Sequence, residues 1–206
     1  AVVPCVNGQA GPYACKGIDL VSFIPHSTWS GQGGNDIWGW TDTVTGHEYA
    51  LVGTQTGTAF VDITVPETPV YVGVLPCFGC PWPPLAEVRL EDGPPHDKDT
   101  PRCEPGADPG HSHGSCQGSS LWRDMEVYGD HVYIGSEQAG HGLVVFDLRQ
   151  LRNVTPPLPK VFSQTSRFGG VGQSHTITVD PVGGTVFING SRSATRCAPG
   201  PTNTGG

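Results

Sequence analysis

Cysteine and histidine side chains are concentrated in residues 77–118, CFGCPWPPLAEVRLEDGPPHDKDTPRCEPGADPGHSHGSCQG. Thiolates and imidazoles are the usual ligands of tetrahedral zinc, and the Cys-x-x-Cys pair of Cys77 and Cys80 fits such a site. Cys103 and Cys116 have twelve residues between them, which is wider than the spacing of a structural zinc site. We therefore favour two disulfides that pin a long loop, and the four cysteines allow three pairings.

His111 and His113 indicate a second kind of site in the same stretch. Imidazoles two positions apart on an extended segment point the same way, and a carboxylate from Asp97, Asp99 or Asp108 would complete a mixed shell for a transition metal. The order of residues in EDGPPHDKD does not match a calcium loop. Histidines in long loops are more often solvated, so we expect no cofactor. A metal ion on His111, His113 and Asp97 is the alternative.

Two further histidines, His141 and His175, precede predicted strands. Ser174, His175 and Asp180 would form a catalytic triad only if the fold brought them together, and the sequence contains no nucleophile-elbow, zinc-protease or phosphate-loop motif. We expect the two imidazoles to connect neighbouring structural units. The alternative is a metal-dependent binder or hydrolase that uses a channel face lined by Arg123, Asp124, His141 and His175.

The elements that must position these side chains are paired short strands. EYALVGTQTGTAFVDIT predicts strands at 49–53 and 58–63, and HVYIGSEQAGHGLVVFDL predicts strands at 131–135 and 142–148. When the two pairs are aligned on Asp62 and Asp147, both show an aromatic-aliphatic strand, a glycine-containing turn and an apolar strand. The sequence therefore contains an internal repeat. SHTITVDPVGGTVFING predicts a third pair at 176–180 and 185–189. No segment shows sustained helical periodicity.

A tryptophan segment precedes each of the first two pairs, IWGWTD and LWRDMEVYGD. Trp38 and Trp122 take equivalent positions in the segments that precede successive units, so we expect both rings to be packing residues. Trp40 aligns with Asp124 and has no tryptophan counterpart, so a surface role for Trp40 stays open.

Repeats of about forty residues with three or four short antiparallel strands are typical of β-propeller blades. The predicted fold class is all-β, a loop-rich partial propeller of about three blades with disulfides. A ring needs about four to eight blades, so either the sequence is a fragment or other blades come from elsewhere. The predicted organisation is an N-terminal segment (1–34), a first repeat (35–76), the Cys/His insertion (77–118), a second repeat (119–160), and an incomplete third repeat with a tail (161–206).

Composition restricts the partners and the compartment. A formal net charge of −8 argues against nucleic acid or an anionic membrane surface as the partner, and no apolar run is long enough to span a bilayer. Seven cysteines with one methionine indicate an oxidising, extracellular location. Asn153 and Asn189 begin N-glycosylation sequons.

Five segments together resemble one family. CVNGQAGPYACKGIDLVSFIP, NDIWGWTDTVTGHEYALVG, GTAFVDITVPETPVYVGVLP, LWRDMEVYGDHVYIGSEQAGHGLVVFDLRQLRNV and SHTITVD occur in the order found in choice-of-anchor B proteins, which carry LVIVD-type propeller repeats. The resemblance covers most of residues 1–190 outside 76–119. It implies a secreted or surface-displayed propeller with a distant C-terminal anchor, and it does not imply a reaction.

The resemblance also places Cys5 and Cys15 where a bridge would staple the N-terminal segment, and chain entropy favours such a short loop. Cys197 is then the odd cysteine. We expect a non-enzymatic, extracellular module with a structural role or with protein or glycan partners, and we expect it to self-associate because a partial propeller leaves a strand edge open.

Overall fold

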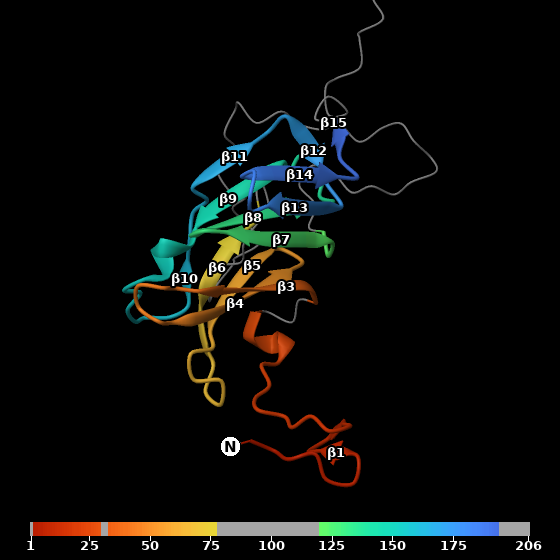
Figure 1. The fold of residues 1–206 in the computed structure, drawn as a ribbon, viewed down its shortest axis with the longest axis vertical. Helices are drawn as coiled ribbons and strands as arrows, with labels where there is room; N and C mark the ends of the chain where they lie inside the picture. Colours follow the sequence, from red (N-terminus) through yellow and green to blue (C-terminus); the bar gives the residue numbers. More distant parts are fainter. Residues whose placement is uncertain (1, 30–32, 78–119, 194–206) are drawn as a thin grey trace, which may run out of the picture.

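The computed structural model describes residues 2–29, 33–77 and 120–193. Within these ranges the chain is all-β, apart from two short 3-10 turns, η1 (His26–Trp29) and η2 (Leu148–Leu151). Figure 1 shows the N-terminal segment below a stack of sheets, with the short strands β12 and β15 near the top. The all-β prediction is therefore confirmed.

Two meanders of antiparallel strands form the body of the described fold, and neither closes on itself. Sheet 1 contains β3 (Gly34–Thr41), β4 (Glu48–Thr54), β5 (Gly57–Asp62) and β6 (Val70–Pro76), with β10 (Lys160–Val161) parallel to β6 at its outer edge. Sheet 2 contains β7 (Arg123–Tyr128), β8 (His131–Ser136), β9 (Leu143–Asp147) and β11 (Ser166–Phe168).

Three smaller strand pairs complete the described structure. They are the hairpin of β13 (Thr176–Asp180) and β14 (Thr185–Asn189), the pair of β12 (Val171–Gln173) and β15 (Arg192–Ser193), and the hairpin of β1 (Gln9–Ala10) and β2 (Tyr13–Ala14). All six predicted strands are present, with ends that differ by at most one residue. The strand that completes sheet 2, β11, lies in the range predicted for the third repeat.

The aspartates that close the repeated strand pairs have the same local role. Asp62 accepts a hydrogen bond from the Thr64 amide at 2.9 Å, and Asp147 accepts one from the Arg149 amide at 2.9 Å. A short carboxylate that binds the backbone two residues ahead favours a turn over further strand. This chemistry ends β5 and β9 at equivalent places and accounts for the repeated Asp.

The main core lies between the facing surfaces of sheets 1 and 2. Phe60 of β5 stacks on Phe146 of β9 with ring centroids 4.8 Å apart, and Phe162 meets both rings edge-on. Leu51, Met125, Val132, Ile134, Val144 and Leu148 are buried in the same cluster. Alternate residues along each strand supply this face, as the period of a β-strand requires.

The packing prediction for the tryptophans is wrong. Trp40 is buried and stacks on Tyr49, whereas Trp38 is 41% exposed and Trp122 is 54% exposed. Trp38 lies inside β3, opposite Leu51, and Trp122 precedes β7, so the two rings do not hold equivalent positions. Only the C-terminal part of β3 reaches the core around Leu151, and Trp40 occupies that part.

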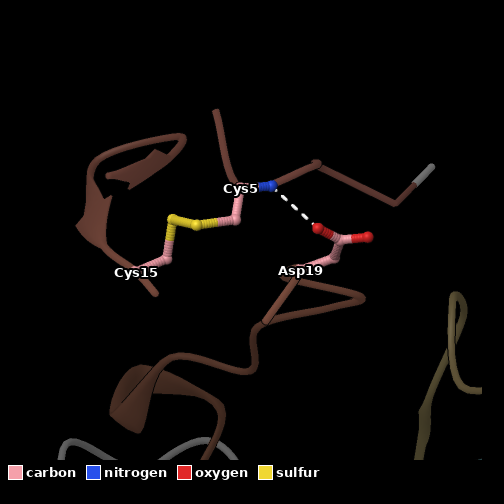
Figure 2. Close-up of a disulfide and its surroundings, with 3 residues drawn as sticks. All are labelled: Cys5, Cys15 and Asp19. Carbon is pink, nitrogen blue, oxygen red and sulfur yellow. Dashed lines mark hydrogen bonds between the residues drawn. A yellow bond between two sulfur atoms is a disulfide. The ribbon is translucent and has the colours of Figure 1, made fainter. Parts of the chain in front are cut away.

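The N-terminal segment covers part of the other face of sheet 1. Trp29 packs with Ala59 and Val61 in a second, smaller cluster. Further toward the terminus, Cys5 and Cys15 form the predicted disulfide, and the Cys5 amide donates to Asp19 Oδ1 at 2.8 Å (Figure 2). The bridge closes the loop that contains the β1–β2 hairpin, a region with little apolar core of its own.

Candidate functional site

The first strands of sheet 1, sheet 2 and the following hairpin lie side by side, with β7 between β3 and β13 (Figure 1). Asp36 Oδ2 on β3 accepts a hydrogen bond from the Met125 amide on β7 at 2.9 Å. Asp124 Oδ2 on β7 accepts one from the Ile177 amide on β13 at 2.7 Å. The same carboxylate-to-amide contact therefore joins two successive pairs of strands. We call Asp36 and Asp124 the linking aspartates.

The linking aspartates are held close to other carboxylates. The pKa of Asp124 is raised, chiefly by burial and then by repulsion from Asp36 and Glu126, although the Ile177 amide opposes the shift. Glu126 itself accepts a close hydrogen bond from the Val179 amide. Carboxylates satisfied by backbone amides in this way position neighbouring strands, and they are not free bases.

Glycine at one repeated position lets the next unit approach. Gly53 and Gly135 occupy the same place in YALVGT and HVYIGS. A Cβ on Gly53 would lie 3.4 Å from Met125 Cε, and a Cβ on Gly135 would lie only 2.5 Å from Ser174 Oγ. Close approach of the next unit therefore requires glycine at position 135, whereas a Cβ at position 53 would make only ordinary contacts.

Arg123 and His141 form a buried pair at the end of the sheets where β7 begins. Arg123 Nη1 lies 2.9 Å from His141 Nε2, and both side chains are almost fully buried. His141 Nδ1 lies 3.0 Å from the Gly142 carbonyl, so Nδ1 carries the proton and Nε2 accepts from Arg123. Burial, and secondarily the charge of Arg123, lower the pKa of His141 to about 3. Burial lowers the pKa of Arg123 to about 10.

His175 differs from His141 because its side chain is 64% exposed. Its Nδ1 makes a close contact with Glu137 Oε1, which joins the start of β13 to the turn after β8. Ser174 is buried and its Oγ has no partner among the described residues. Asp180 lies at the far end of β13, about 16 Å from His175 along an extended strand, so Ser174, His175 and Asp180 do not form a triad.

The four residues predicted to share a face are thus divided between environments. Arg123 and His141 are buried, with Arg123 also bonded to Thr54 of sheet 1, whereas Asp124 bridges to β13 and His175 is exposed. We expected both histidines to connect neighbouring units. His175 does so through Glu137, whereas His141 contacts Arg123 of its own sheet. Sequence reasoning missed Asp36 and Glu137. The Asp shared by NDIWG and RDMEV is the available signal for Asp36, but the predicted equivalence of Trp38 with Trp122 pairs Asp124 with Trp40 instead.

The other predicted site residues lie partly outside the described ranges. Asn153 and Asn189 are exposed, as a glycan acceptor must be. Cys77 is buried and disulfide-bonded. The positions that the structure does not describe are Cys80, Asp97, Asp99, Cys103, Asp108, His111, His113, Cys116 and Cys197. No group of three or more potential metal ligands occurs among the residues that are described.

An open groove of about 510 Å³ separates the N-terminal segment from the connection between β5 and β6. Val3, Leu20, Phe23, Ile24, Pro69 and Tyr71 line it, together with the carboxylate of Glu67. Its lining is mainly apolar and offers few groups that could orient a polar substrate.

Comparison of the chain with protein-family models, with curated proteins and with solved structures finds no match. Across the part of the chain that the structure describes, no helix has the length and apolar character to cross a membrane.

Proposed function

We propose that the chain is part of an extracellular β-propeller related to the choice-of-anchor B proteins, and that it acts as a structural or interaction module. The observation that carries this proposal is the repeated link from Asp36 to Met125 and from Asp124 to Ile177. Propellers place the first strand of each blade around a common centre, and a repeated contact between first strands is what such packing requires.

A module of this kind would work outside the cell, and the Cys5–Cys15 disulfide supports an oxidising compartment. Its partners would be proteins, glycans or further copies of itself. Antibodies against the purified chain should label intact source cells or their medium, and a cytosolic antigen would contradict the location. Light scattering after size-exclusion chromatography should detect assemblies, and a stable monomer would exclude self-association.

Glycans on Asn153 and Asn189 belong to the same proposal, because both side chains are exposed. The native protein should lose mass on enzymatic removal of N-glycans. Asn153→Gln and Asn189→Gln would each remove one glycan, and an unchanged mass would reject the modification at that site.

One observation favours a second candidate, a hydrolase or metal-dependent binder. Glu137 contacts Nδ1 of the exposed His175, and a carboxylate in this position orients an imidazole for proton transfer or metal binding at Nε2. Zinc binding or ester hydrolysis that is present in the native chain and lost in folded Glu137→Gln and His175→Ala variants would favour this candidate.

A further inference from the structure

The guanidinium group of Arg123 is enclosed but incompletely bonded. Its side chain is 2% exposed. Nε donates to the Thr54 carbonyl at 3.2 Å, and Nη1 donates to His141 Nε2 at 2.9 Å. Nη2 is buried and finds no acceptor among the described residues. Both N–H groups of Nη2 are therefore without a partner among the described residues, in a place that bulk water does not reach.

The positive charge of Arg123 is also uncompensated in the described part of the chain. None of its ion pairs includes Arg123. His141 is neutral, since its Nδ1 proton is directed to the Gly142 carbonyl. Buried charges in proteins are normally paired, because removing an ion from water without a counter-charge is expensive. A single water would accept from Nη2 but would leave the charge unbalanced.

A second guanidinium adds to the local positive charge. Arg167 Nε donates to the His141 carbonyl at 2.8 Å, and Nη2 of Arg167 makes a close contact with the Gly140 carbonyl. The turn that carries His141 is thus held by Arg123 on its ring and by Arg167 on its backbone. This concentration of cationic groups stands out in a chain of net charge −8.

We propose that Arg123 Nη2 is the binding point of a small monovalent anion, of the size of chloride or formate, at the end of the sheets where β7 begins. The anion accepts from both N–H groups of Nη2 and balances the buried charge.

Thermal and denaturant unfolding of the full chain test this site. Sodium chloride or sodium formate replaces sodium gluconate at constant ionic strength, so that only the small anion varies. The folding equilibrium constant of the native sequence should rise in proportion to the small-anion concentration once the site is saturated. Arg123→Met should abolish the dependence, and Arg149→Met, which removes an exposed arginine, should retain it. Equal dependence in all three proteins, or none in the native sequence, would overturn the proposal.

A second measurement needs no variant and covers the case in which Arg123→Met does not fold. Crystals of the native chain are soaked in sodium bromide, and anomalous scattering locates the bromide. A bromide within hydrogen-bond distance of Arg123 Nη2 supports the site. A water or an empty space at that position in the bromide-soaked crystal overturns it.

Discussion

The contact between Phe60 and Phe146 gives the most direct test of how sheets 1 and 2 pack. Both rings have zero exposed surface, and their centroids are 4.8 Å apart. Replacing either phenylalanine by leucine keeps the core apolar but removes buried ring atoms, and it should cost about 1–3 kcal/mol. The ring pair itself contributes about 0.5–1.5 kcal/mol beyond its buried area. The double variant should therefore lose about 0.5–1.5 kcal/mol less than the sum of the single losses, because the pair is lost only once.

Urea unfolding of the native chain, both single variants and the double variant measures this coupling. The control cycle pairs Phe60→Leu with Phe187→Leu, since Phe187 is 52% exposed on β14. The control losses should add within about 0.5 kcal/mol. Additive losses for Phe60 and Phe146, or two unfolding transitions each sensitive to one substitution, would refute a common core between the two sheets.

Three other outcomes are expected. Burial and neighbouring carboxylates raise the pKa of Asp124, so its ionisation destabilises the fold above that pKa; Asp124→Asn should gain stability relative to the native chain as the pH rises from 3 to 7 in urea titrations. Gly135→Ala should cost about 1–3 kcal/mol through the clash with Ser174 Oγ, and adding Ser174→Ala should recover part of it in the same assay. Arg152 hydrogen-bonds both oxygens of Asp42 and holds the pKa of Asp42 far below its usual range, so this pair stabilises the fold above about pH 4. Arg152→Met should lower the unfolding midpoint at pH 7, and the difference should shrink as the pH falls below 4; a difference that is constant with pH would contradict the ion pair.

The strands of the repeat were predictable because local chemistry determines them. Alternating apolar residues separated by glycine-containing turns predict six strands, β4, β5, β8, β9, β13 and β14. The closing aspartates, Asp62 and Asp147, end two of them. The sheet that each short strand joins was not predictable. β10 has only two residues and no pattern, and its pairing with β6 depends on a chain path that local sequence does not record.

The sequence predicted several residues of the candidate site, but it did not predict their burial or their partners. The sequence singles out both His141 and Arg123, but it does not indicate that Arg123 also donates to the Thr54 carbonyl of the other sheet. Glu137 carries no motif and is recognised only when β13 brings His175 beside it. The exposure of Trp38 and burial of Trp40 depend on where along β3 the core ends, which hydrophobicity alone does not indicate.

The pairing of β10 with β6 has a consequence for biosynthesis. The chain completes β6 at Pro76 but supplies its outer neighbour only at Lys160, about 80 residues later. At typical translation rates of about 5–20 residues per second, the β6 edge of sheet 1 stays without this neighbour for roughly 4–16 s on the ribosome. During that interval the β6 edge lacks its final neighbour, and strand edges without a neighbour can pair with another chain.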